Sequence, residues 1–336
     1  MHKLKKLSAI IFTILLLFIA GFSYVLLDIL RYADAPASTE GREIFVAVHP
    51  GEGFGNISEK LLETGVIKYP FKFKLLARVK GYDKKIKAGE YCLSAAMTPL
   101  RILETVANGK VFFYKLTVPE GYNIKQIAQA VAKLGMGTEK AFSEIATDPS
   151  FVQEKGIDAR TYEGYLFPDT YYLSKGATAK QIISLMVKRF ESVFTPEWKK
   201  RADLMKFSVH QVITLASIIE KETGDPSERP IISSVFHNRL KRRMRLQSDP
   251  TVIYGIKNFD GNITRKHLKT RTAYNTYKIR GLPPGPIANP GKKAIEAALY
   301  PADTRFLYFV SKKDRTHKFS TNLKDHNRAV RKYQLR

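Results

Sequence analysis

The chain is poor in cysteine, with one in 336 residues. This single cysteine, Cys92, excludes an intrachain disulfide and any cysteine-rich metal site. It lies between Tyr91 and Leu93, and free cysteines are among the most buried residues. We therefore expect Cys92 to be a buried structural thiol.

Acidic residues are also few, at 31 against 56 lysines and arginines, so the formal net charge is +25. An excess of this size attracts anionic partners through long-range electrostatic fields. A nucleic acid, an anionic membrane surface and an acidic polymer that carries peptide carboxylates all meet this condition. Composition by itself does not choose between them.

Cofactor motifs do not occur in the sequence. It has neither the G-x-x-x-x-G-K-[ST] loop that binds phosphates nor the G-x-S-x-G turn that presents a nucleophilic serine. His317 and His326 are too isolated to indicate a zinc site. We therefore expect no metal and no cofactor.

One long apolar run lies near the N-terminus. Residues 8–27, SAIIFTILLLFIAGFSYVLL, contain no charged residue. At about 1.5 Å per residue, the run spans the roughly 30 Å hydrocarbon core of a bilayer. It is long for a cleaved signal peptide, although Ala33-Asp34-Ala35 loosely resembles a cleavage site. We predict a retained single-pass membrane anchor.

The charges that flank this run predict its orientation. His2, Lys3, Lys5 and Lys6 precede it, so residues 1–7 should stay in the cytoplasm. The rest of the chain then faces outward from the cell inner (plasma) membrane, into the periplasm or its equivalent. Export argues strongly against nucleic acid as a partner. Residues 28–42, which end in a small and polar stretch, are predicted to be a linker.

Two later segments share one order of elements: a strand, a turn with proline and glycine, and a short helix. The first comprises a strand at 44–48 and a helix at 56–67, with Asn56 or Ser58 as the candidate N-cap. The second comprises a strand at 115–118 and a helix that ends near Gly135. The repeat is of modest strength.

The first copy, with its V-x-P-G turn, loosely resembles a LysM module, a class that binds glycan strands. An ordinary α+β scaffold is the alternative. We predict an α+β protein with a small LysM-like βα domain at 43–113 and a larger mixed α/β domain at 114–336.

The most informative helix is predicted over 208–224, SVHQVITLASIIEKETG. Ser208 and Gln211 form a capping box, and Gly224 fits the position just after the C-terminus. Glu220 and Glu222 lie in the last turn and flank the apolar stripe. The negative end of the helix dipole and partial burial both raise a carboxyl pKa, which suits a general acid. Two solvated helix-end glutamates are the alternative.

Five long motifs lie before, within and after this helix in a fixed order. They are EGYLFPDTYYL at 163–173, LASIIEKETGDPSERPIISSVFHNRL from 215, MRLQSDPTVIYG at 244–255, TAYNTYKIRGLPPGPIANPG at 272–291 and HKFSTNLKDHN at 317–327. Together they closely resemble the YceG-like family of endolytic murein transglycosylases, across about residues 40–333. That family consists of membrane-anchored lytic transglycosylases that cut nascent peptidoglycan internally.

The resemblance implies a role for particular residues. The catalytic glutamate of the family falls on the second glutamate of E-K-E-T, Glu222, and Glu220 becomes a supporting residue. The remaining motif residues that are suited to sugars are expected in or beside the groove: Glu163, Asp169, Gln247, Asp249, Tyr254, Asn275 and Tyr277. For each of these, a structural role is the alternative.

The resemblance also implies the reaction and its partners. Glu222 would protonate the glycosidic oxygen and then deprotonate the C6 hydroxyl of N-acetylmuramic acid, which leaves a 1,6-anhydro end and terminates the strand. Peptidoglycan strands are the implied substrate, and peptidoglycan synthases are possible partners. The sequence departs from the family at Arg243, where a glycine is common, so the local turn geometry is in question.

Two other functions remain open. A glycoside hydrolase would use a second carboxylate, with Glu163, Asp169 or Asp249 as the candidates. A non-enzymatic scaffold would bind peptidoglycan and recruit synthases without any need for Glu222.

Overall fold

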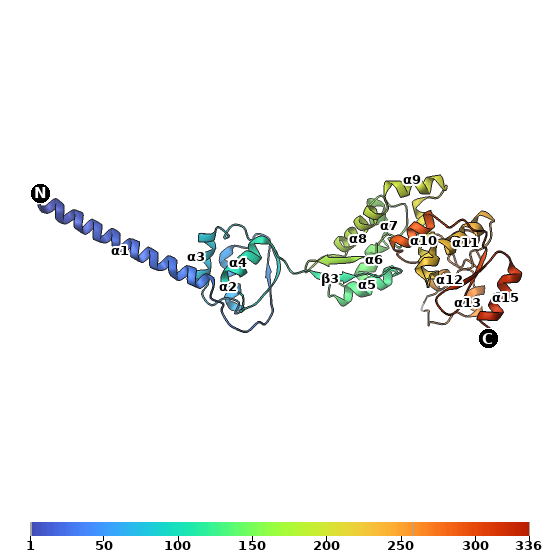
Figure 1. Cartoon of the computed structure of the whole chain (residues 1–336), viewed down its shortest axis with the longest axis horizontal. Helices are drawn as coiled ribbons and strands as arrows, with labels where there is room; N and C mark the ends of the chain where they lie inside the picture. Colours follow the sequence, from blue (N-terminus) through green and yellow to red (C-terminus); the bar gives the residue numbers. More distant parts are fainter. Residues whose placement is uncertain (1, 258, 336) are drawn as a thin grey trace. The chain divides into compact units, whose positions relative to one another are not determined.

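The computed structural model describes residues 2–257 and 259–335 (Figure 1). The chain forms two compact units. Unit 1 comprises the residues up to Tyr114 together with Tyr172–Lys175, and unit 2 comprises Lys115–Tyr171 and the residues from Gly176 onward. Helices dominate both units, and the strands of the described residues form three two-stranded sheets. The predicted α+β class is confirmed.

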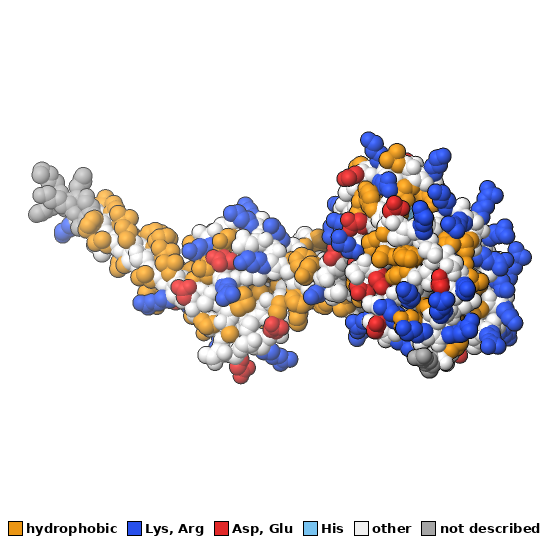
Figure 2. Space-filling view, turned by 45° about the vertical axis from the view of Figure 1, so that its right-hand side comes forward, with side chains coloured by type: hydrophobic (Ala, Val, Ile, Leu, Met, Phe, Trp, Pro, Cys, Tyr) orange, Lys and Arg blue, Asp and Glu red, His pale blue; other side chains and the backbone are white. Residues whose placement is uncertain are grey.

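The first helix, α1 (His2–Ala33), contains the predicted anchor. Its part from Ile10 to Ala33 is long and apolar enough to cross a membrane, with a mean hydropathy of 2.7. The apolar side chains from Ile10 to Leu27 are exposed, as Figure 2 shows along the protruding helix. A helix with apolar side chains on all sides is stable only in an apolar environment.

The last turn of α1 belongs to the globular part of unit 1. Ile29, Tyr32 and Ala33 are buried in its core, and Tyr32 meets the ring of Tyr69 edge-on at 6.2 Å. The first six residues of the predicted linker therefore continue the helix.

The rest of unit 1 is a small α/β layer on this helix end. Strand β1 (Ile44–Val48) pairs antiparallel with β2 (Gly89–Leu93), and three helices cover the pair. These helices are α2 (Phe54–Glu63), α3 (Pro70–Lys80) and α4 (Pro99–Asn108). The expectation of a fully buried Cys92 was wrong, because alternation along β2 turns Tyr91 and Leu93 inward and Cys92 outward.

The predicted cap of α2 was also wrong. The helix begins at Phe54 after Gly53, which makes no side-chain cap, and Asn56 and Ser58 lie inside the helix. The Ser58 hydroxyl donates to the carbonyl of Phe54 at 2.8 Å. Phe54 stacks on Phe73 at 5.7 Å, so tertiary packing of this ring accounts for the earlier start.

Unit 2 is larger and mostly helical. Strand β3 (Tyr114–Thr117) pairs with β4 (Thr170–Leu173), and the boundary between the two units falls within both strands. Strand β5 (Tyr308–Ser311) pairs antiparallel with β6 (His317–Ser320). The helices before the glutamate helix are α5 (Ile124–Lys133), α6 (Glu139–Ala146), α7 (Pro149–Glu154), α8 (Ala179–Val193) and α9 (Pro196–Leu204). The predicted second strand and helix of the repeat correspond to β3 and α5.

The glutamate helix, α10 (Val209–Glu222), lies at the centre of unit 2. It packs against α14 (Lys292–Leu299), α11 (Arg229–Lys241) and α12 (Asp249–Tyr254). Every residue from Val212 to Ile219 is buried, so the helix has no solvent face over that stretch. The remaining elements are the short helix η1 (Pro226–Glu228), α13 (Arg265–Lys269) and α15 (Leu323–Tyr333).

Because Tyr32 joins α1 to the core of unit 1, its removal should destabilise that unit. Tyr32→Ala should lower the free energy of unfolding by about 3 kcal/mol, as for other large-to-small core changes. Tyr24→Ala, at a position 74% exposed in the same helix, is the matched control and should change it little. Urea unfolding of the full chain in detergent measures both, and equal effects would contradict the packing of the helix end.

Candidate active site

Glu222 is the last residue of α10, so the end of this helix positions its side chain in the site. The predicted capping box of Ser208 and Gln211 is present at its start. At its end, Thr223 is already extended, and its hydroxyl donates to the carbonyl of Ile219 at 2.6 Å. The structure therefore confirms the predicted helix, which ends at Glu222, one residue before the predicted last residue, Thr223.

The structure gives a different reason for a glycine at position 224 than the predicted helix cap. Its φ is not positive, so it does not form a left-handed cap. Instead, a Cβ at this position would lie 2.6 Å from the carbonyl oxygen of Arg315. Glycine is required here because the backbone of another loop comes into contact with the chain just after the helix.

Glu222 has an unusual electrostatic environment. Its Oε1 accepts a hydrogen bond of 2.6 Å from the hydroxyl of Ser248. Burial raises the pKa of Glu222 to about 7; the Ser248 hydroxyl opposes this shift, Asp249 adds to it and Arg239 opposes it more weakly. A carboxyl group with this pKa exchanges its proton near neutral pH, as a general acid and base must.

The side chain of Glu222 lines a cleft of unit 2. The cleft has a volume of about 530 Å³ and is walled by the loop before α12, strand β5 and helix α15. Its polar lining includes Glu222, Arg239, Gln247, Asp249, Tyr277 and Asn327. A second cavity of about 500 Å³, lined by Pro226, Arg229 and Tyr300, does not include Glu222.

Three of the predicted groove residues share this cleft with Glu222. The hydroxyl of Tyr277 donates to Asp249 Oδ1 at 2.7 Å, which fixes both side chains in the wall. Gln247 has a left-handed backbone, with φ of 52°, and its Oε1 accepts from Arg239 at 3.2 Å. A non-glycine residue held in this conformation stores strain of the kind found at functional sites.

Glu220 has a different role from Glu222. One carboxylate oxygen accepts from the guanidinium of Arg229 at 2.8 Å, and the other accepts from the backbone N–H of Gly291 at 2.9 Å. The side chains of Glu220 and Arg229 are 7% and 12% exposed. Glu220 thus ties α10 to α11 and to the start of α14.

Glu163 occupies a separate buried polar cluster. Its carboxylate accepts from the N–H of Ile124 at 3.2 Å, the amide of Asn289 at 3.0 Å and the hydroxyl of Tyr254 at 3.1 Å. Burial raises the pKa of Glu163 to about 7 despite these hydrogen bonds. Glu163 and Tyr254 are not among the residues that line the cleft of Glu222.

Asn275 and Asp169 also lie outside that lining. Asn275 is fully buried; its amide donates to the carbonyl of Thr270 at 2.5 Å, and its Oδ1 accepts from the N–H of Tyr277 at 2.9 Å. It therefore shapes the loop that presents Tyr277. Asp169 accepts from Arg189 Nε at 2.6 Å on a more exposed part of unit 2.

Two residues that the sequence reasoning did not single out are central to the site. Ser248 lies inside the quoted motif LQSDP and is the direct partner of Glu222. Arg239 is 6% exposed and donates to the carbonyls of Leu307 and Leu246 at 2.6 and 2.7 Å. The sequence could have indicated Arg239 because it lies within the apolar face of α11, and a buried arginine nearly always has polar partners.

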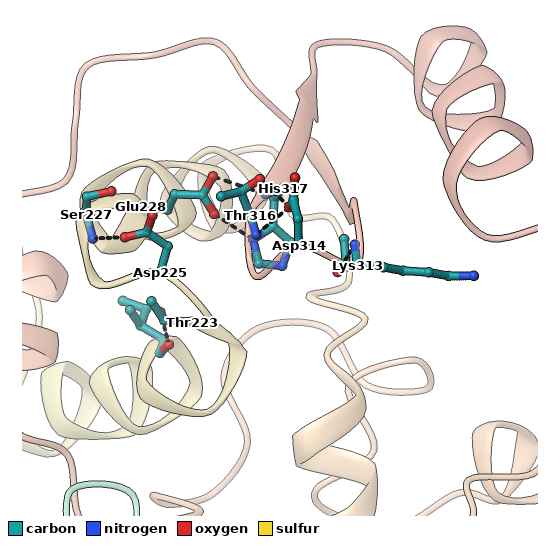
Figure 3. A network of polar contacts seen from close by, with 10 residues as sticks. Thr223, Asp225, Ser227, Glu228, Lys313, Asp314, Thr316 and His317 are labelled. Atoms are coloured by element: carbon teal, nitrogen blue, oxygen red, sulfur yellow. Dashed lines mark hydrogen bonds and ion pairs between the residues drawn. The ribbon is translucent and has the colours of Figure 1, made fainter.

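The turn between β5 and β6 supports the chain that follows α10 (Figure 3). His317 Nδ1 lies 2.7 Å from Glu228 Oε2, and the N–H of His317 donates to Glu228 Oε1 at 3.1 Å. Lys313 and Arg315 have φ of 69° and 72°, which gives the turn its shape. Through the carbonyl of Arg315, this turn packs on Gly224, two residues after Glu222.

The raised pKa of Glu222 predicts a pH-dependent stability effect. The folded state holds the proton more tightly than the unfolded state, so ionisation destabilises the fold as pH rises from 4.5 to about 7. Glu222→Gln should therefore raise the free energy of unfolding by about 3 kcal/mol at pH 8 and leave it nearly unchanged at pH 4.

Urea unfolding at both pH values measures this difference, with the exposed Glu191→Gln on α8 as the control. A gain that is equal at both pH values would show that Glu222 titrates normally in the folded protein.

Comparison with known proteins assigns the chain to a family. The model of the YceG-like family matches residues 46–332. The endolytic murein transglycosylase of Bacillus subtilis is 35% identical over 305 residues, which cover 86% of this chain and 84% of that protein. The endolytic murein transglycosylase of Streptococcus pneumoniae strain D39 is 30% identical over 92% of this chain and 61% of that protein.

A solved structure agrees with this assignment. The crystal structure of a yceG-like protein from Listeria monocytogenes is 36% identical and superposes with a TM-score of 0.61, over 85% of this chain and 98% of that one. The match of the family model over most of the chain shows the relationship directly, and the chain therefore belongs to the YceG-like family.

Proposed function

We propose that this protein is a membrane-anchored lytic transglycosylase that cuts peptidoglycan glycan strands internally, with Glu222 as its one acid–base residue. The observation that carries the proposal is the half-buried Glu222 carboxyl, with a pKa of about 7, at the wall of a cleft. The names of the two relatives, endolytic murein transglycosylase, support the substrate and the reaction.

A single carboxyl group is sufficient for lytic cleavage. Protonated Glu222 gives its proton to the oxygen that leaves C1 of N-acetylmuramic acid, and the C1–O bond to N-acetylglucosamine breaks. The resulting carboxylate then takes the proton of the C6 hydroxyl as that oxygen bonds to C1. The products are a 1,6-anhydro end and a free hydroxyl on the other sugar, with no water consumed. An acid that becomes the base works best with a pKa near the working pH.

The hydroxyl of Ser248 suits this alternation. As a donor it stabilises the carboxylate form, and a neutral partner does so less than a cation would. Gln247, Asp249 and Tyr277 supply hydrogen-bond groups and an aromatic face along the cleft for the sugar rings. Glu220, Glu163, Tyr254 and Asn275 act as supporting residues through the contacts that hold the walls.

A two-carboxylate hydrolase is the second candidate. Of its proposed partners for Glu222, Asp249 lines the same cleft, whereas Glu163 and Asp169 do not. The hydrogen bond from Tyr277 fixes the Asp249 carboxyl group in the cleft wall, where it suits substrate contact as well as base catalysis. Product chemistry separates the two reactions.

The proposal also includes the orientation of the chain in the membrane, the roles of its two domains and its protein partners. Helix α1 anchors the chain in the cell inner membrane with its N-terminus in the cytoplasm and both units outside. The domain at 43–113 acts as a LysM-like module that holds the glycan strand, and the domain from 114 onward cuts it. Cleavage of nascent strands terminates their elongation, so peptidoglycan synthases are the expected protein partners.

A digest of purified peptidoglycan tests the reaction and the residue together. The full chain in detergent should release anhydro-muropeptides, which mass spectrometry identifies, and Glu222→Gln should lower their rate of release by at least about 100-fold. Glu220→Gln is the neighbouring control. It should keep the reaction while losing about 3 kcal/mol of stability, because Arg229 loses its buried partner.

Each other outcome has a definite meaning. Reducing ends that have gained water would identify a hydrolase with Asp249 as the next residue to test. An absence of products from the wild type on both nascent and mature strands would favour the peptidoglycan-binding scaffold.

Ser248 provides a test of how the pKa of Glu222 is set. Its hydrogen bond lowers the pKa of Glu222, so Ser248→Ala should raise that pKa further. Activity requires the protonated acid, and the alkaline limb of the kcat/KM profile should therefore move up by about one pH unit. If Ser248→Ala lowers kcat/KM but leaves the alkaline limb of its pH profile at the same pH, then Ser248 only shapes the loop and does not set the pKa of Glu222.

A further inference from the structure

Helix α3 carries an apolar row that is exposed at Phe71 and Val79, whereas Leu75 between them is partly buried against the core of unit 1. Phe71, Leu75 and Val79 are spaced four residues apart, which places them along one side of the helix. Phe71 is 76% exposed, the highest value among the large apolar side chains of the described residues, and Val79 is 51% exposed. The opposite side, with Phe73 and Leu76, is buried. An apolar row of this kind calls for a covering partner.

The row lies beside the point where the membrane helix ends. Lys72 forms an ion pair of 2.7 Å with Asp28 of α1, and the ring of Tyr69 packs on Tyr32 of the same helix. The first turn of α3 is thus held against residues 28–32, and Figure 1 shows α3 next to the C-terminal end of α1.

The rise of the helix gives the depth of this contact. Asp28 directly follows the uncharged run 8–27, so the hydrocarbon boundary lies near Leu27. Residues 28–32 extend no more than roughly 8 Å beyond it at 1.5 Å per residue. The headgroup layer on each side of a bilayer is about 5–7 Å thick, so the start of α3 lies within that layer.

The charges around the row suit a phospholipid surface. Arg31 and Lys68 are exposed near the junction, and Lys72 neutralises Asp28. Helices that lie in a membrane interface combine an apolar side with flanking cations and aromatic residues in this way.

We propose that α3 lies in the headgroup layer of the membrane that α1 spans, with Phe71 and Val79 toward the acyl chains. Unit 1 is then held against the phospholipid surface by two elements, a spanning helix and an interfacial one. This inference rests on the proposed membrane anchoring of α1 and adds the surface and orientation of unit 1.

Tryptophan reporters in the full chain test the proposal. The one native tryptophan, Trp198, is first replaced by phenylalanine. Phe71→Trp and Val79→Trp then report on the row, and Phe45→Trp on strand β1, 46% exposed, is the matched control in the same unit. Each variant is reconstituted into phosphatidylglycerol–phosphatidylethanolamine vesicles, with and without lipids brominated near the headgroup end of the acyl chain.

The proposal predicts that the Phe71→Trp and Val79→Trp variants lose most of their tryptophan emission in brominated vesicles, with a blue shift, and that the control loses little. Flotation of the vesicles reports the anchoring separately. Protein that floats while all three reporters keep their emission, or lose it equally, would overturn the placement of α3 and leave the anchor intact. Protein that does not float would overturn both.

Discussion

The partial burial of one carboxyl group, that of Glu222, at the end of a buried helix is the constraint on which the rest of unit 2 depends. A carboxylate in a desolvated position is costly, and the protein offsets this with a neutral hydroxyl from Ser248 rather than with a direct ion pair. The pKa of Glu222 therefore stays near 7 instead of falling. The walls of unit 2 keep this group desolvated and still open to a cleft.

The glutamates of unit 2 show how the environment assigns roles to identical side chains. Glu220 lies two residues before Glu222 on the same helix, but its two oxygens are bound by Arg229 and by the N–H of Gly291. Glu163 has a raised pKa like Glu222, but its donors enclose it away from the cleft lining. A raised pKa thus becomes useful for catalysis only where the group also faces a space for the substrate.

The walls of the site hold their shape through backbone conformations that their residues do not favour. Gln247 has φ of 52° next to Ser248, and Arg243 has φ of 54° at the start of the same loop. A glycine at the position of Arg243 would adopt that conformation without strain, so the turn keeps its geometry here at a cost of about 1 kcal/mol. Arg239 stabilises the loop by donating to the carbonyls of Arg245 and Leu246.

The sequence by itself determined the long apolar helix near the N-terminus, the α+β class, the approximate extent of α10 and the family to which the chain belongs. These properties depend on local patterns: an uncharged run, apolar periodicity, the capping box of Ser208 and motifs with fixed spacing. Only the tertiary structure decided that Ser248 and Arg239 surround Glu222, that Glu163 lies in a separate cluster, and that Gly224 is required by the carbonyl of Arg315. The physical reason is that pKa values, close approaches and cleft walls arise from residues far apart in sequence, and local periodicity carries no information about which of them meet.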